Sequence, residues 1–169
     1  RVVEIGPGRG SNFPYFGSGT SVLGLEPNPA FHEALTERAS AEGIDLEVVA
    51  GDLRSAALPP ESEDAIVSTL VLCSVGDVDA ELAEIKRVLR SGGRLVFIEH
   101  VPAARGTARY WAQRVLRRPW RFVADGCDMC NETQAALARA GFSELDGTLD
   151  VLGPNADPSS LIYWGTAVR

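Results

Sequence analysis

The stretch Val2-Val3-Glu4-Ile5-Gly6-Pro7-Gly8-Arg9-Gly10 decides the fold of this chain. Its apolar first half is typical of a short buried strand, and its second half is a turn with glycine at alternate positions. Glycine lets the backbone bend sharply and come close to a ligand. A second apolar run, residues 21–25, ends at the carboxylate of Glu26. A glycine turn after one strand and an acid after the next is how an open α/β sheet holds a nucleoside, because the loop wraps the ligand and the acid bonds the ribose hydroxyls.

The spacing of the glycines favours one nucleoside cofactor over another. A dinucleotide fingerprint places its third glycine three residues after the second, but Ser11 stands there and the glycines fall at 6, 8 and 10. This pattern fits S-adenosylmethionine better than NAD, so a nicotinamide oxidoreductase is the weaker alternative. The residues expected at the cofactor site are Glu4, Gly6, Gly8, Gly10, Asn12, Glu26, Pro27, Asp52, Leu53 and Leu70.

Three of these residues have a specific expected contact. Asp52 follows a third apolar run and suits the amino group of adenine, with Leu53 offering a backbone contact. The alternative is that Asp52 caps a helix over residues 53–58. Glu4 faces the glycine turn, where it would hold the ammonium group of the cofactor directly or through water. A buried carboxylate without a partner costs several kcal/mol, so we expect a cationic partner for Glu4.

Apolar runs alternate with segments of helical periodicity along most of the chain. This order predicts a single α/β domain over residues 1–169, with a doubly wound, mostly parallel Rossmann-like sheet. The expected strands cover residues 1–5, 21–26, 46–50, 65–72, 94–100, 143–152 and 161–168, the last two joined by a turn at 153–158. The expected helices cover residues 29–42, 78–89 and 131–141. Their expected caps and stops are Asn28 for the first, Asp77 and Gly92-Gly93 for the second, and Asn131 with Gln134 for the third.

Composition limits the classes of function. Of the 169 residues, 45% are apolar and 23% are charged, which is ordinary for one globular domain. The net charge of −7 weighs against a nucleic-acid partner, because phosphate binding favours a basic surface. Three cysteines, with no signal peptide and no run long enough to span a bilayer, predict a reduced, cytoplasmic location. The chain begins with Arg1, almost inside its first strand, so we expect further sequence upstream, where an anchor or targeting segment would lie.

Several short motifs together resemble one enzyme family. Glu4-Ile5-Gly6-Pro7-Gly8-Arg9-Gly10, Glu26, Gly51-Asp52 and Leu89-Arg90-Ser91-Gly92-Gly93 look like the ordered motifs of class I methyltransferases. A narrower resemblance is to the methyltransferase-like 7 family, the microsomal thiol S-methyltransferases, and their bacterial relatives. It is carried by Thr69-Leu70-Val71-Leu72-Cys73-Ser74-Val75, by Glu99-His100-Val101, and by Trp120 followed by Asp125-Gly126-Cys127.

The resemblance carries expectations about both fold and activity. It implies a seven-stranded sheet whose last strand is antiparallel and lies between strands five and six. It also implies a methyltransferase that uses S-adenosylmethionine and acts on a small apolar acceptor, with a thiol as the first choice. Two alternatives stay open, namely a phospholipid N-methyltransferase acting on phosphatidylethanolamine and a non-catalytic cofactor-binding module.

Methyl transfer from a sulfonium needs a positioned acceptor and a dry site more than a fixed set of catalytic residues. His100 ends an expected strand, where open α/β sheets bind their ligands, so it is the first candidate for a base or substrate contact. The alternative is a histidine bonded to the structure near the strand end. Asp125 is the second catalytic candidate, and we expect it to line the substrate side together with Cys127.

The pair Cys127 and Cys130 has the spacing of a metal or redox motif. A zinc site needs four ligands, and the chain has no second cysteine pair and no histidine nearby in sequence. A redox motif of the thioredoxin type belongs at a helix start just after the first strand, and this pair comes late in the chain. The sequence therefore predicts no metal.

Residues 101–130 form an expected helical insert beside the substrate side. Their first part has no acidic residue and six arginines, although the net charge of the chain is −7: Arg105, Arg109, Arg114, Arg117, Arg118 and Arg121. Ala108, Trp111, Ala112, Val115 and Leu116 fall on one helical face. A basic amphipathic helix of this kind predicts a lid over an apolar or lipid-like substrate and weak association with an anionic membrane surface. The alternative is a helix packed on the core with its arginines in solvent.

Overall fold

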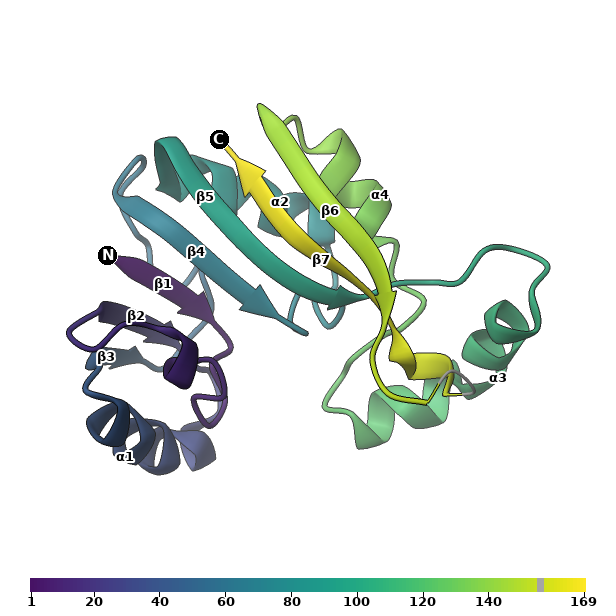
Figure 1. Ribbon diagram of the computed structural model, residues 1–169, viewed down its shortest axis with the longest axis horizontal. Coiled ribbons are helices and arrows are strands. Elements are labelled where there is room, and N and C mark those ends of the chain that lie inside the picture. Colours follow the sequence, from purple (N-terminus) through teal and green to yellow (C-terminus); the bar gives the residue numbers. More distant parts are fainter. Residues whose placement is uncertain (155–156) are drawn as a thin grey trace.

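The computed structural model describes residues 1–154 and 157–169, so Asn155 and Ala156, in the turn expected at 153–158, lie outside the described residues. Seven strands form one sheet in the order β3-β2-β1-β4-β5-β7-β6 (Figure 1). They are β1 (Val2–Ile5), β2 (Ser21–Leu25), β3 (Asp45–Val49), β4 (Glu63–Thr69), β5 (Leu89–His100), β6 (Glu144–Val151) and β7 (Leu161–Val168). β7 pairs antiparallel with β5 and β6, and the other pairs are parallel. The sequence-based fold class and the reversed last strand are confirmed.

Helices pack on both faces of this sheet. They are α1 (His32–Glu42), α2 (Val78–Val88), α3 (Ala108–Val123) and α4 (Thr133–Arg139), with short 3-10 helices η1 (Phe13–Tyr15), η2 (Pro29–Phe31) and η3 (Pro158–Ser160). α2 and α4 lie together on one face, α1 lies beside β2 and β3, and α3 stands apart from the sheet (Figure 1). Within the described ranges we find no helix with the length and apolarity that a bilayer span requires.

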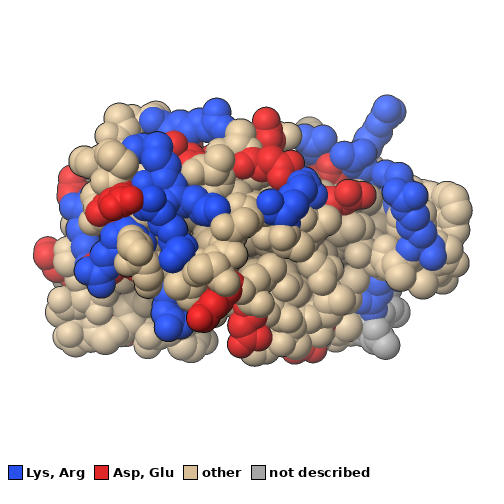
Figure 2. Space-filling view, turned by 90° about the horizontal axis from the view of Figure 1, so that it is seen from above, with Lys and Arg blue, Asp and Glu red and all other residues tan. Residues whose placement is uncertain are grey.

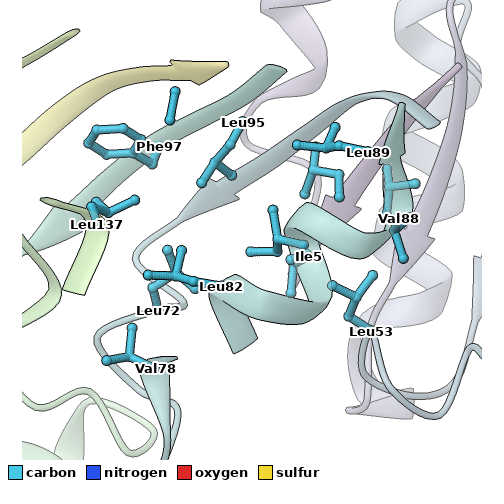
Figure 3. Close-up of a cluster of buried hydrophobic side chains, with 14 of the residues drawn as sticks. Ile5, Leu53, Leu72, Val78, Leu82, Val88, Leu89, Leu95, Phe97 and Leu137 are labelled. Carbon is cyan, nitrogen blue, oxygen red and sulfur yellow. The ribbon is translucent and has the colours of Figure 1, made fainter. Parts of the chain in front are cut away.

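Two hydrophobic clusters hold these layers together. The larger cluster packs α2 and α4 against the sheet, and Figure 3 shows Leu82 of α2 and Leu137 of α4 pointing toward Leu95 and Phe97 of β5. The smaller cluster joins α1 and η1 to the opposite face of β2, and it consists of Phe13, Val22, Leu35, Ala39 and Ile44. Successive side chains of a strand face opposite sides, so each face of β2 supplies one cluster.

One half of the sheet is covered by helices on a single face. Val96 of β5 and Trp164 of β7 alternate with residues of the larger cluster, so they lie on the other face, where they are 39% and 44% exposed. Figure 1 shows no helix in front of β5, β7 and β6. Among the described residues, the second helical layer therefore extends only over the half of the sheet that contains β2 and β3.

The first two helices start where the sequence predicts but differ in detail. The side chain of Asn28 accepts a hydrogen bond from the N–H of Ala30 at 3.1 Å, yet the first turn is the 3-10 helix η2. Asp77 caps α2 by accepting from the N–H of Ala80 at 3.0 Å. The expected stop at Gly92-Gly93 is wrong, because α2 ends at Val88 and these glycines belong to β5.

The glycine pair has a different purpose in the strand. Glu63 faces Leu89 and Ala65 faces Arg94, so residues 90–93 bulge out of β5. A Cβ at Gly93 would lie 2.9 Å from the carbonyl oxygen of Arg90, which leaves room only for glycine.

The expected capping box of the third helix is also wrong. α4 starts at Thr133 and has no side-chain cap. The side chain of Asn131 instead donates to the carbonyl oxygen of Leu72 at 3.2 Å. The residue thus ties the start of α4 to the turn after β4.

Ion pairs connect the amino ends of several strands. Arg1 pairs with Glu63 and Asp64, and Arg90 also pairs with Asp64. Basic and acidic side chains lie beside one another on the face seen in Figure 2. Exposed pairs such as Arg90 with Asp64 contribute about 1 kcal/mol or less each, so the two hydrophobic clusters hold the fold.

Candidate functional site

The loop after β1 contains three glycines in the left-handed region of the backbone. Gly6, Gly8 and Gly10 have φ angles of 59°, 57° and 76°. A Cβ at Gly6 would lie 2.7 Å from Cγ2 of Val71, whereas a Cβ at Gly8 would meet no atom within 4 Å. The backbone at Gly8 is therefore open to an approaching ligand.

The carboxylate of Glu26 ties this loop to the one that follows β2. Its Oε2 accepts a hydrogen bond from the N–H of Gly8 at 2.9 Å, and its Oε1 accepts from the N–H of Asn28 at 2.8 Å. Glu26 is only 4% exposed. Each carboxylate oxygen has a further lone pair, so ligand hydroxyls can be bound without breaking these bonds.

Glu4 is buried beneath the glycine loop. Its Oε1 accepts from the side-chain N–H of Asn12 at 2.7 Å, and Asn12 also donates to Thr69 at 3.0 Å. Its Oε2 is buried without a partner. Burial raises the pKa of Glu4 to about 7, against the opposing effect of the Asn12 bond. Among the described residues its side-chain partner is the neutral amide of Asn12, and near neutral pH the carboxyl is partly protonated. The expected cationic partner, the ammonium group of the cofactor, stays a prediction.

A cavity of about 580 Å³ opens beside these loops. Of the residues expected at the cofactor site, Gly6, Gly8, Glu26, Pro27, Asp52 and Leu70 line it. Glu4, Gly10, Asn12 and Leu53 lie outside its lining among the described residues, and the side chain of Leu53 is part of the larger hydrophobic cluster.

Two residues in the cavity wall have unusual local structure. Leu70 has a φ of 59°, a conformation that non-glycine residues rarely adopt, and its N–H donates to the carbonyl of Ile98 at 2.7 Å. This turn ends β4 at Thr69, three residues earlier than predicted. Asp52 accepts from the N–H of Ser55 at 2.8 Å, and the backbone and hydroxyl of Ser55 lower the pKa of Asp52. Asp52 therefore caps a turn, and the alternative of a helix over 53–58 is wrong.

The two catalytic candidates occupy different surroundings. Asp125 lines the cavity directly after α3 and has a φ of 47°. His100 ends β5 as predicted but is absent from the described lining of the cavity, and its Nδ1 lies 3.1 Å from Sγ of Cys127. This contact agrees with the alternative prediction for His100, a histidine bonded to the structure near the strand end.

Cys127 is part of a cluster that sequence reasoning missed. Its Sγ lies 3.4 Å from Sγ of Cys73, which in turn lies 3.8 Å from Nδ1 of His100. Hydrogen bonds from Cys73 and then His100 lower the pKa of Cys127 to about 5, against the effect of burial. The bond to Cys127, burial and the charge of Glu99 raise the pKa of Cys73. The pairing of Cys127 is thus with a distant cysteine, and Cys130 takes no part in it.

Glu99 is a second residue whose role the sequence did not reveal. It is completely buried, and it accepts hydrogen bonds from the hydroxyl of Ser68 and the N–H groups of Val71, Leu72 and Cys73, at 2.7 to 3.2 Å. Burial raises its pKa to about 7, although these bonds oppose the shift. Its carboxyl group shapes the turn that carries Leu70 and Cys73. The sequence contained one signal that could have predicted this arrangement. It is an acid within an apolar strand, together with a run of apolar residues after the neighbouring strand.

The insert forms α3, and most of its apolar side chains face solvent. Trp111 is 61% exposed, Val115 is 76% exposed and Phe122 is 90% exposed. Gln113 is the one buried residue recorded in this helix, and it bonds to backbone groups of Val101, Ala103 and Pro158. The alternative of a helix packed on the core is therefore wrong. α3 leads directly into Ala124 and Asp125, which line the cavity.

The family model and the similar proteins that match this chain are methyltransferases. A methyltransferase domain model matches residues 3–97, which is more than half of the chain. Thiol S-methyltransferase TMT1A of Homo sapiens is 40% identical over 148 residues, covering 85% of this chain and 60% of that protein. Phosphatidylethanolamine N-methyltransferase of Cereibacter sphaeroides is 30% identical over 111 residues, covering 63% of this chain and 53% of that protein. The chain thus spans about 60% of the length of the thiol S-methyltransferase it matches.

Solved structures share the fold. An S-adenosylmethionine-dependent methyltransferase from Mesorhizobium loti gives a TM-score of 0.70 at 23% identity, covering 100% of this chain and 90% of that one. A second, from Aquifex aeolicus, gives a TM-score of 0.65 at 17% identity, covering 98% and 80%. In this chain the cavity lies at the carboxyl ends of the parallel strands, since Ile5, Leu25 and Thr69 end β1, β2 and β4 and line it. Open α/β sheets bind ligands at this edge.

Proposed function

Because the chain belongs to the methyltransferase domain family, we propose that it transfers a methyl group from S-adenosylmethionine to the sulfur of a small apolar thiol. The observation that carries this proposal is the bond between Gly8 and Glu26, which joins two strand-end loops in the wall of a cavity of about 580 Å³. The likeness to thiol S-methyltransferases supports a thiol acceptor. A phospholipid amine is the second candidate, supported by the more distant phosphatidylethanolamine N-methyltransferase.

The residues of the site fit S-adenosylmethionine in their chemistry. Glu26 would bind the ribose hydroxyls, Asp52 the amino group of adenine, and the open backbone at Gly8 would approach the ligand closely. Glu4 and Asn12 lie under the same loop and would bind the amino-acid part through hydrogen bonds. When bound, the cofactor supplies an electrophilic methyl group, so the chain has to position the acceptor and exclude water.

The acceptor would lie against the apolar part of the cavity, where Leu70, Val71 and Val75 contribute to the wall. A thiol with an ordinary pKa of about 8.5 is only a few per cent ionised at neutral pH. Asp125 is a candidate to bind the acceptor or take up its proton, since it lines the same cavity. We also propose that α3 borders the entrance and contacts anionic lipid, because its arginines accompany exposed apolar side chains.

Binding and turnover can be measured separately. Calorimetry should detect S-adenosylhomocysteine binding and no comparable binding of NAD. The matched variants are Glu26→Gln and Glu33→Gln, since Glu33 is an exposed residue of α1. We expect Glu26→Gln to weaken binding at least about tenfold, because its amide would face the N–H of Gly8, and Glu33→Gln to have no effect.

The acceptor is then identified by transfer of a labelled methyl group to thiols, phenols and phosphatidylethanolamine. Transfer to thiols supports the proposal, and transfer to phosphatidylethanolamine alone replaces it with the lipid alternative. Cofactor binding without turnover on any acceptor, measured with the full-length protein, would favour the binding module. Binding of NAD alone would remove the proposal.

A further inference from the structure

Three side chains of the types that bind soft metal ions meet at one point, although they come from three separate segments. Cys73 lies in the turn after β4, His100 ends β5, and Cys127 follows α3. One potential ligand atom from each, two sulfurs and one ring nitrogen, lies within 4.8 Å of the other two.

The spacing of these atoms matches a tetrahedral metal site. A tetrahedral zinc ion, with bonds of about 2.3 Å to sulfur and about 2.0 Å to nitrogen, separates two sulfur ligands by about 3.8 Å and a sulfur from a nitrogen by about 3.6 Å. The observed separations are 3.4 Å between the sulfurs, and 3.1 Å and 3.8 Å from the sulfurs to Nδ1 of His100. The triangle therefore needs changes of about 0.5 Å or less to accept the ion.

Charge and burial also suit a divalent cation. Cys73 is fully buried and Cys127 is 6% exposed. Two thiolates and one neutral imidazole carry a charge of about −2, which cancels that of the ion, so the occupied site is neutral in a buried place. Thiolate ligands with imidazole favour zinc over magnesium or calcium, which prefer oxygen.

The groups around the ligands hold them in place. The N–H of Cys73 donates to Glu99 at 3.0 Å, and the carbonyl of Cys73 accepts from the N–H of Asp128 at 3.1 Å. Asp128 is fixed by Arg117, which donates from Nε at 2.8 Å and from a terminal nitrogen at 2.6 Å. Such supporting bonds are a regular part of metal sites.

We propose that Cys73, His100 and Cys127 bind one zinc ion, with a fourth coordination position left open. Each ion that binds displaces the remaining thiol protons to solvent, so no oxidant or reductant is involved. Ser74 and Asp125, close in sequence to two of the ligands, line the cavity, so the metal lies beside it. The ligands themselves are absent from the described cavity lining, and zinc binding can be measured without methyl transfer.

The test measures zinc bound to the whole protein, purified with a reductant and incubated with zinc before removal of the excess. Elemental analysis should give one equivalent for the parent protein. Cys73→Ser, Cys127→Ser and His100→Ala should each lose most of it. Cys130→Ser is the matched control and should keep one equivalent, since Cys130 takes no part in the cluster. Titration with cobalt gives a second readout, because two thiolate ligands produce charge-transfer absorption that should fall in both cluster cysteine variants.

Circular dichroism identifies variants that fail to fold. If a variant fails, zinc binding by the parent protein still tests the proposal. Zinc should raise the unfolding temperature of the parent, and a chelator should reverse the rise. A folded, reduced parent that binds no zinc above buffer background overturns the proposal. A Cys73–Cys127 disulfide in metal-free protein prepared with a reductant, or equal loss of zinc in Cys130→Ser, overturns it as well.

Discussion

Two glycine substitutions can distinguish backbone strain from interference with a bound ligand. Gly8 and Gly19 both have left-handed φ angles, 57° and 82°, and a Cβ at either would meet no atom within 4 Å. Gly8→Ala and Gly19→Ala should each lower the free energy of unfolding by about 1 kcal/mol, because both strain the backbone. Only Gly8→Ala should weaken S-adenosylhomocysteine binding, by about tenfold or about 1.4 kcal/mol, since its methyl group would stand where the ligand approaches. Denaturation and calorimetry measure the two effects, and equal affinities would contradict a ligand at Gly8.

The buried carboxyl of Glu4 should make stability depend on pH. Its pKa is about 7 in the folded protein against 4.5 without burial. Between these values the folded state holds a proton that the unfolded chain has lost, so stability falls as pH rises through this window and levels off above it. The shift corresponds to a loss on the order of 3 kcal/mol. Glu4→Gln cannot ionise, so the change in unfolding free energy between about pH 5 and about pH 8 should shrink, leaving the share of Glu99.

Urea denaturation at the two pH values measures this effect. Glu33→Gln, an exposed change on α1, is the control and should keep the slope of the parent. An unchanged slope in Glu4→Gln would show that this carboxyl is ionised in the folded state.

The sequence identified some of these residues and missed others for physical reasons. Glu26 and Asp52 follow apolar runs, and the carboxyl ends of parallel strands meet at one edge, so local pattern was enough to select them. Cys73 lies 54 residues before Cys127, and only the packing of the turn after β4 beside the end of β5 brings them together. The sequence spacing pointed to Cys130 as the partner of Cys127, whereas the partner in the structure is Cys73.

At the scale of elements, the exposed face of α3 can be tested for association with anionic lipid. Arg114 and Arg118 are exposed, whereas Arg117 is bonded to Asp128 and should be left intact. Arg114→Glu with Arg118→Glu should reduce sedimentation with anionic vesicles at low salt, since each arginine near such a surface contributes about 1 kcal/mol. Binding by the parent should also fall as salt rises, because charges are screened over about 8 Å at physiological ionic strength.

The control for this experiment carries the same change of charge elsewhere. Arg38→Glu with Arg90→Glu alters α1 and β5, where both arginines form exposed ion pairs. This variant should sediment like the parent. Equal loss in both double variants would show that net charge alone drives the binding, and no loss in either would leave α3 as a solvated surface.

Strands were easier to predict than helix ends. The apolar runs of β1, β2 and β7 are bounded by turns, so their limits agree closely with the structure. The end of α2 was misplaced because Gly92-Gly93 serves a bulge in β5, and a glycine pair signals either feature. The cap of α4 was misplaced because Asn131 bonds across to the carbonyl of Leu72, a partner that sequence spacing does not reveal.

At the scale of the whole molecule, two glycines allow the last strands to pair. Gly147 of β6 faces Gly165 of β7, and a Cβ at Gly165 would lie 2.0 Å from the carbonyl oxygen of Asp146. Gly165→Ala should lower the free energy of unfolding by about 1–3 kcal/mol and speed amide exchange in β6. Gly17→Ala is the control, since its Cβ would meet only Thr20 at 3.8 Å. Unchanged exchange in β6 would contradict this close approach.

The order of the last two strands could not be derived from hydrophobic pattern. A hairpin of β6 and β7 satisfies the same alternation whether β6 or β7 lies next to β5. The resemblance to methyltransferases supplied the order, and the pairing of Val96 with Thr166 shows that β7 is the inner strand.

This inner position has a consequence during synthesis. β6 emerges from the ribosome first, but it pairs with β7 and lies at the sheet edge, so it has no place in the sheet until β7 has been made. At typical translation rates the intervening residues take about one to a few seconds to appear. Until β7 has been made, the edge of β5 that it will cover stays unpaired, and an unpaired strand edge is a place where another chain can pair.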